Sequence, residues 1–175
     1  PPAIRPGARW RALGQEPGDF EAREGRPFVE WAPSGALLTE TLRRAGLSRS
    51  DVSLSNVRLC SAPKKMRDAD KSRADDCCWP RLLREIEQAP AVLALGKTAF
   101  AACQRLGAGG EGRGEAGLTA MRGFPITLRV SGRSVPALAT YHPAFALRSR
   151  RWLPTLRSDV LKALRHASGR LDWEE

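Results

Sequence analysis

Long apolar runs are missing from the sequence: no stretch is long enough to cross a bilayer, and no signal peptide is visible. The four cysteines include no Cys-x-x-Cys pair, so a zinc site built from them alone has little support. Cys77 and Cys78 are adjacent, and adjacent cysteines cannot easily be two arms of a disulfide framework. We therefore expect reduced thiols, no metal site and a cytoplasmic protein.

Two binding motifs are also absent. The chain has no Gly-x-x-x-x-Gly-Lys phosphate loop, and its glycine-rich stretch at 107–117 does not follow a strand, which disfavours a simple nucleotide-binding protein. No basic amphipathic helix carries a Trp or Phe face, which disfavours docking to a membrane.

Acidic residues are outnumbered by basic ones. The 29 Lys and Arg residues exceed the 19 Asp and Glu residues, and the formal net charge is +10. Such an excess favours a polyanionic partner, with nucleic acid as the first candidate. The plainer alternative is an arginine-rich surface that only faces water.

The rest of the composition is that of a globular protein, with 42% apolar and 27% charged residues. A chain of 175 residues can bury its own core, so we expect one monomeric domain over residues 1–175, with 1–7 as a loose arm. Apolar runs and alternating patterns predict strands near 8–13, 51–59, 91–95, 125–130 and 135–140.

Helical spacing of apolar residues predicts helices near 35–45, 78–88, 96–106 and 154–168. We expect Ser34 to cap the first of these helices and Pro80 to lie in the first turn of the second. Residues 61–76 are highly charged and are predicted to be a surface loop. Because strands alternate with helices, the predicted fold class is α/β: a three-layer α/β/α sandwich with a mostly parallel central sheet.

Polar residues follow three of the predicted strands. Gln15 and Glu16 come after the first strand, in a tight loop that Gly14, Pro17 and Gly18 shape. Asn56 lies near the end of the second strand, and His142 follows the last one. Because ligands of parallel sheets bind at the carboxyl ends of strands, we expect these side chains to converge on one site.

These segments together resemble the uracil-DNA glycosylase superfamily, most closely its family 4-like enzymes with a Gly-Glu-x-Pro-Gly loop. The order Gln15-Glu16 is instead similar to the Gln-acid loop of family 1, with Glu in place of Asp. The residues that carry the resemblance are Gly14–Gly18, Gly25–Val29, Ser55–Val57, Cys78–Leu82, Ala94–Gly96, Arg122–Gly123 and Tyr141–Pro143.

The resemblance implies a DNA repair glycosylase that hydrolyses the N-glycosidic bond of flipped-out uracil and leaves an abasic site. Phe28 would stack on the base and Asn56 would read its edge, whereas His142 would donate to uracil O2. Glu16 would stabilise the sugar cation and orient water, with Asp19 or Glu21 as alternative acids. The rest of the site around the uracil would be formed by Gln15, Gly14, Gly18 and Asp19.

The segment after the His-Pro pair resembles the superfamily's intercalating loop. Phe145 or Leu147 would fill the gap left by the base, although Phe145 could equally serve as a hydrophobic staple. Phosphates would be contacted by Arg148, Arg150, Arg151, Lys64 and Lys65.

Cys60 and Cys78 match two ligand positions of a 4Fe–4S cluster in family 4, whose other two ligands are an upstream pair that residues 1–13 lack. Either residues upstream complete a cluster or this branch has lost it, and we favour loss; Cys77 and Cys103 are then core thiols. The loop after the second strand has no histidine, so we expect no covalent adduct and a monofunctional enzyme. The alternative function is a non-catalytic or weakly catalytic module that binds DNA or abasic sites.

Overall fold

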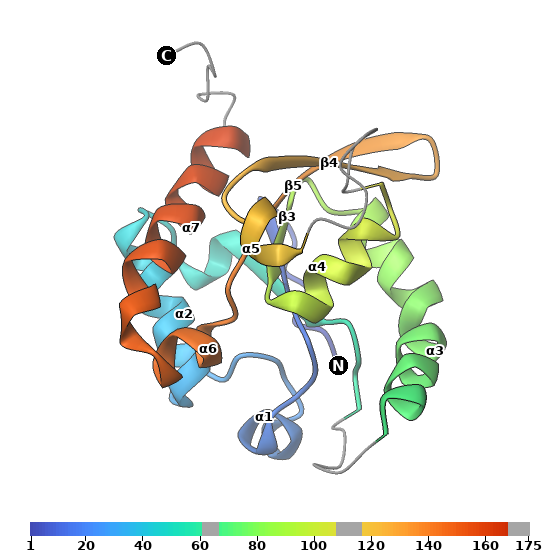
Figure 1. The fold of residues 1–175 in the computed structure, drawn as a ribbon, viewed down its shortest axis with the longest axis horizontal. Coiled ribbons are helices and arrows are strands. Elements are labelled where there is room, and N and C mark those ends of the chain that lie inside the picture. The colour runs from blue at the N-terminus through green and yellow to red at the C-terminus, as the bar shows by residue number, and fades with distance from the viewer. Residues whose placement is uncertain (61–66, 108–116, 168–175) are drawn as a thin grey trace.

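The computed structural model describes residues 1–60, 67–107 and 117–167, which form a central sheet between two layers of helices (Figure 1). The sheet has the order β2-β1-β3-β5-β4, in which only β4 is antiparallel to its neighbour. The predicted three-layer α/β fold is therefore confirmed. The strands are β1 (Trp10–Gly14), β2 (Val52–Asn56), β3 (Val92–Leu95), β4 (Pro125–Val130) and β5 (Arg133–Thr140).

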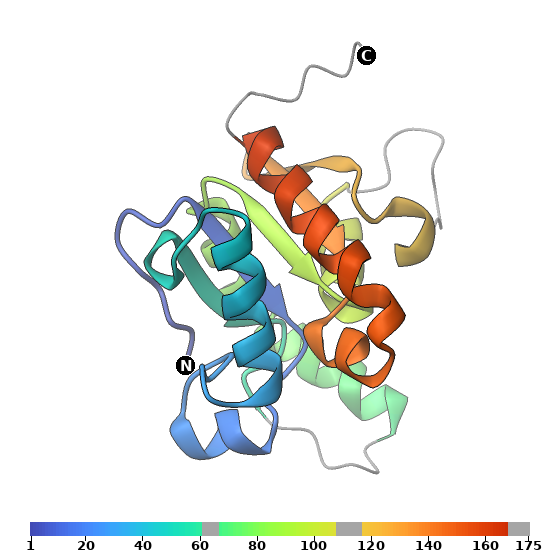
Figure 2. The same cartoon turned by 90° about the vertical axis from the view of Figure 1, so that its left-hand side faces the viewer.

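Helices cover both faces of the sheet, as Figures 1 and 2 show. On one face lie α3 (Asp68–Glu87), α4 (Lys97–Gln104) and the short α5 (Leu118–Met121). On the other lie α2 (Pro33–Arg44), α6 (Pro143–Arg148) and α7 (Leu153–Ala167). The remaining helices are α1 (Asp19–Glu24) and the 3-10 turns η1 (Arg49–Asp51) and η2 (Arg150–Trp152).

The apolar run of β3 explains why this strand is central. Val92 and Ala94 face the core under α3 and α4, whereas Leu93 and Leu95 face the core under α2 and α7. Successive side chains of a strand point to opposite faces, so a strand with helices on both sides is apolar throughout.

Two helices begin earlier than the sequence pattern predicted. Ser34 is not the cap of α2, because Ala32 is the N-cap and Pro33 occupies the first turn, where its fixed φ suits a helix. Residues 68–76 were predicted as loop but belong to α3, so Pro80 lies inside this helix and not in its first turn. The beginning of α3 is charged and buries few apolar side chains, and ion pairs such as Asp68–Lys71 and Arg67–Asp70 stabilise it.

Three smaller expectations also change. Residues 1–7 are not a loose arm, because Ala3 exchanges two backbone hydrogen bonds with Leu54 of β2, at 2.8 and 3.0 Å. The segment after His142, expected as a loop, is the helix α6. Among the residues described, no helix is both long and apolar enough to cross a membrane.

Candidate active site

Strand register brings the first candidates together. Gly14, the last residue of β1, lies opposite Asn56, the last residue of β2, and Asn56 is only 3% exposed. A Cβ atom at Gly14 would lie 2.4 Å from the Asn56 Oδ1 atom and 2.7 Å from the Phe28 Cζ atom. The absence of a side chain at Gly14 therefore lets the carboxamide and the phenyl ring approach each other.

Phe28 has a backbone conformation that is unusual for a residue other than glycine, with φ of 50°. Its N–H donates to Glu21 Oε1 at 2.8 Å, and its carbonyl accepts from Arg49 Nη2 at 2.5 Å. Such a conformation persists only where surrounding contacts fix it, and strained residues of this kind are concentrated at functional sites. The Phe28 ring is thus held in place by its own backbone contacts.

The first turn of α2 contacts the backbone of Phe28 and Val29. A Cβ atom at Gly35 would lie 1.9 Å from the carbonyl oxygen of Val29, so only glycine permits this contact of helix and loop. The backbone of the Phe28–Val29 segment therefore lies directly against α2.

His142 is the N-cap of α6, and its Nδ1 atom accepts a hydrogen bond from the Ala144 N–H at 3.1 Å. Burial, with a smaller contribution from the nearby charge of Arg148, lowers the pKa of His142 from 6.5 to about 4. The imidazole is therefore neutral near pH 7, and because Nδ1 is an acceptor, the proton resides on Nε2. His142 can donate one hydrogen bond from Nε2.

His142 also contacts Phe28. The two rings are stacked, with centroids 5.7 Å apart and planes inclined by 29°. Stacked rings in direct contact have centroids about 4.5–7 Å apart, so a base does not fit between these two side chains. A pyrimidine would lie beside the pair instead of within it.

Glu16 is held through both carboxylate oxygens. Gln15 Nε2 donates to Oε1 and Arg58 Nη1 donates to Oε2, each at 2.9 Å. Arg58 also donates to Asp75 of α3, from Nε at 2.6 Å and from Nη2 at 3.1 Å. Burial alone would lower the pKa of Arg58, but its hydrogen bonds to the two carboxylates outweigh this effect and raise it.

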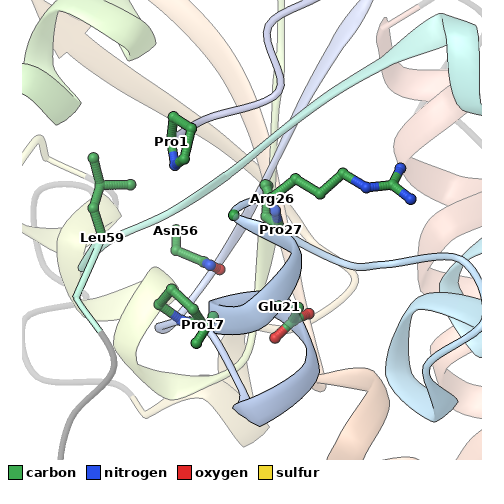
Figure 3. Close-up of a pocket in the computed structure, with 9 residues that line it drawn as sticks. Pro1, Pro17, Glu21, Arg26, Pro27, Asn56 and Leu59 are labelled. Carbon is green, nitrogen blue, oxygen red and sulfur yellow. The ribbon is translucent and has the colours of Figure 1, made fainter.

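A cavity of about 280 Å³ opens beside Asn56 (Figure 3). Its volume is several times the roughly 30 Å³ share of one water molecule. Figure 3 shows the Asn56 carboxamide between Pro17 and Pro27. Apart from the alternative acid Glu21, Asn56 is the one predicted catalytic or substrate-binding residue in this lining, which does not include Gly14, Gln15, Glu16, Gly18, Asp19, Phe28 or His142. The lining residues are Pro1, Pro17, Glu21, Ala22, Gly25, Arg26, Pro27, Asn56 and Leu59.

Glu21 is not a free acid. Its Oε2 atom accepts from the Gly18 N–H at 2.5 Å while its Oε1 atom accepts from the Phe28 N–H. Glu21 therefore joins the loop that carries Glu16 to the loop that carries Phe28. Asp19 is exposed at the first position of α1.

The expected DNA-contacting residues lie on α6 and η2. Leu147 is 40% exposed, and Arg148, Arg150 and Arg151 are also exposed. The ring of Phe145 contacts Tyr141 and Trp152, with centroids 5.0 and 6.1 Å away. Phe145 packs against these two rings but is itself 36% exposed, so both Phe145 and Leu147 reach the surface of α6. Lys64 and Lys65 lie outside the described residues.

A buried acid supports the segment that leads to His142. Asp159 of α7 is fully buried and accepts from Thr140 Oγ1 at 2.7 Å and from Arg122 Nη1 at 2.8 and 3.0 Å. The Arg122 guanidinium in turn lies 5.5 Å from the centroid of the Tyr141 ring. The two residues before His142 are therefore tied to α5 and α7.

A 4Fe–4S cluster needs four ligands gathered around one point, and the four cysteines of the described residues are not gathered in this way. Cys60 and Cys77 are exposed, Cys78 is half-buried and Cys103 is fully buried, where burial raises the pKa of its thiol to about 12. Cys103 is thus the core thiol that we expected, but Cys77 is not. Within the described ranges, no three His, Cys, Asp or Glu residues lie where they could hold a metal ion.

Comparison with known proteins identifies the family. The family model of the uracil DNA glycosylase superfamily matches residues 1–165. The chain belongs to the uracil-DNA glycosylase superfamily.

Three relatives of the chain are type-4 uracil-DNA glycosylases. Type-4 uracil-DNA glycosylases from Pyrobaculum aerophilum and Thermotoga maritima are 34% and 36% identical over 154 and 140 residues. These matches cover 87% and 79% of this chain, and 72% and 66% of the two relatives. The type-4 enzyme of Sulfurisphaera tokodaii is 30% identical over 162 residues, 90% of this chain and 69% of the relative.

Sequence reasoning missed two residues that build the site and did not find the structural role of a third. Arg58 and Arg49 gave no signal, because a lone arginine in a basic chain has no distinctive pattern. Glu21 follows Gly18 by three residues, the spacing of a capping box, and this signal could have identified it as a structural acid.

Proposed function

We propose that this protein is a monofunctional DNA repair glycosylase that hydrolyses the N-glycosidic bond of flipped-out uracil in DNA and leaves an abasic site. The observation that carries the proposal is the convergence of Gly14, Phe28, Asn56 and His142, which come from separate parts of the chain, at one edge of the sheet. The match to the superfamily over residues 1–165 supports the same activity.

Asn56 would select uracil through its carboxamide. Its Oδ1 atom can accept from uracil N3–H and its Nδ2 atom can donate to O4, whereas cytosine presents an amino group and an unprotonated N3. Asn56 is buried, so a mismatched base would leave polar groups unpaired, which costs about 1–3 kcal/mol for each group. Phe28 would supply the apolar surface beside the base.

His142 and Glu16 would divide the chemistry. As the bond between C1′ and N1 breaks, its electron pair passes to the uracil, and the Nε2–H of His142 donates to the O2 atom on which negative charge develops. Glu16 would stabilise the positive sugar, orient the water whose oxygen bonds to C1′ and accept the proton that this water loses. A neutral donor suits this role, because His142 keeps its Nε2 proton throughout.

The DNA itself would be engaged by α6 and η2. Leu147 would fill the gap that the extruded nucleotide leaves, and Arg148, Arg150 and Arg151 would contact phosphates. The excess of basic residues supports DNA as the partner. We also propose a monomer in a reducing compartment such as the cytoplasm. A 4Fe–4S cluster that includes Cys60 and Cys78 would need two further ligands from residues upstream, and we propose that this protein works without it.

The test is release of free uracil from a single uracil in a labelled oligonucleotide. The wild-type protein should release uracil, and Glu16→Gln should lower the rate by about 10²-fold or more. Glu24→Gln is the matched control, because Glu24 is an exposed acid at the end of α1 for which we propose no role in binding or chemistry. A wild-type protein that binds this DNA without releasing uracil would support the alternative, a DNA-binding module. One observation favours this alternative: both carboxylate oxygens of Glu16 already accept hydrogen bonds, from Gln15 and from Arg58.

A further inference from the structure

Arg58 is a buried cation shared by two acids from different elements. It is 4% exposed, and its guanidinium bridges Glu16, in the loop after β1, and Asp75, on α3. Its contact with Asp75 uses two nitrogens and both carboxylate oxygens, the fork geometry that fixes an arginine in one orientation. The third nitrogen, Nη1, is thereby directed at Glu16.

The backbone ties the same two segments together. The Arg58 N–H donates to the carbonyl of Gln15 at 2.9 Å, and the Val57 N–H donates to the carbonyl of Gly14 at 3.0 Å. These two hydrogen bonds hold the segments after β1 and β2 side by side, and the ion pair of Arg58 with Glu16 joins the same two segments through their side chains. Glu16 cannot rotate without losing a charge-assisted hydrogen bond to the buried guanidinium of Arg58.

We propose that Arg58, held in one orientation by its two hydrogen bonds to Asp75, is a positioning residue that orients the Glu16 carboxylate for uracil excision. This inference rests on the proposed function. The three groups together carry a net charge of −1, so Arg58 leaves one negative charge to face the developing sugar cation. Arg58 acts only through Glu16 and does not itself contact the substrate.

The experiment is a double-mutant cycle on the single-turnover rate of uracil release. Arg58→Gln should lower this rate on the order of tenfold to hundredfold, the range of coupling between contacting residues, while the Kd for uracil-containing DNA changes little. In the Glu16→Gln background, Arg58→Gln should have almost no further effect. Equal losses in both backgrounds would overturn the proposal, because a purely structural arginine would matter regardless of Glu16.

Charge rescue gives a second measurement. Arg58→Lys keeps the positive charge but loses the fork, so its rate should lie between those of wild type and Arg58→Gln. Asp75→Asn should lower the rate in the same direction by a smaller factor, since Arg58 keeps its bond to Glu16. An Arg58→Lys protein as slow as Arg58→Gln, or an Asp75→Asn protein as fast as wild type, would contradict the proposal.

Arg105→Gln is the matched control. Arg105 also pairs with an aspartate of α3, Asp76, at 3.0 Å, but this pair is exposed and has no contact with Glu16. Its loss should leave the rate unchanged, and a loss equal to that of Arg58→Gln would mean that any ion pair to α3 matters. A wild-type protein that releases no uracil defeats the proposed function itself, whereas an active wild type with additive losses defeats only this inference.

Discussion

The imidazole of His142 is stacked on the ring of Phe28, with centroids 5.7 Å apart. One ring follows the last parallel strand and the other belongs to the loop before α2. The backbone of Phe28 is fixed by Glu21 and Arg49, and the His142 imidazole by the N–H of Ala144. The stack therefore joins the residue proposed to donate a hydrogen bond to uracil O2 to the residue proposed to contact the base.

Removal of the imidazole should disable excision without preventing DNA binding. We expect His142→Ala to lower the single-turnover rate of uracil release by about 10²–10³-fold, the usual loss for one oxyanion donor. The Kd for uracil-containing DNA should change far less, because α6 and η2 keep their arginines. A rate close to wild type would mean that the donor at O2 is another group.

The low pKa of His142 makes stability depend on pH. An unfolded histidine titrates near 6.5, whereas His142 in the fold titrates at about 4. Between these values the unfolded chain binds a proton that the folded chain does not, so the free energy of unfolding decreases as the pH falls from 6.5 towards 4. Above pH 6.5 the contribution is fully present, and it amounts to about 3 kcal/mol.

Urea unfolding of wild type and His142→Gln at pH 7 and pH 4.5 measures this contribution. Other titrating groups affect both proteins alike, so their effects cancel in the comparison. Wild type should lose more stability between the two pH values than the variant does. Identical losses would show that His142 has an ordinary pKa.

Substitution of Asn56 by Asp should weaken recognition of uracil. A carboxylate can only accept, so it cannot donate to O4 and would repel the anion that uracil becomes. Loss of a buried, matched hydrogen bond should lower uracil release by roughly 10²-fold. Base release from otherwise identical oligonucleotides that contain uracil or cytosine gives the ratio of the uracil rate to the cytosine rate. This ratio should fall in the variant, and an unchanged ratio would exclude Asn56 as the residue that selects uracil.

A single methyl group at Gly14 should disrupt the site. The Cβ atom of Gly14→Ala would lie within 3 Å of both Asn56 Oδ1 and Phe28 Cζ, so these side chains must shift. We expect at least a tenfold loss of uracil release and a cost of about 1–3 kcal/mol in stability, as for an overpacked core.

Gly117→Ala is the control for this substitution. Gly117 has φ of −69° and ψ of 164°, and no atom of the described residues lies within 4 Å of its added Cβ. Its activity should match wild type, and its stability should fall only by the cost of alanine at a helix N-cap, about 1 kcal/mol. Normal activity in Gly14→Ala would show that Asn56 and Phe28 need not be so close.

The sequence by itself predicted the layered α/β fold, because apolar runs and alternating patterns are local properties. It also placed Gln15, Glu16, Asn56 and His142 at the ends of strands, since residues after parallel strands must share one edge. It failed at the start of α3, where ion pairs and packing of Leu82 and Ile86 outweigh an internal proline.

Only the tertiary structure decided how these side chains are held. The positive φ of Phe28 depends on Glu21 and Arg49, and the orientation of Glu16 depends on Arg58 and on Asp75 of α3. Such contacts join residues that are distant along the chain, and no local pattern encodes which charged groups will meet. The physical reason is that strand order and helix packing set these distances only after the core has formed.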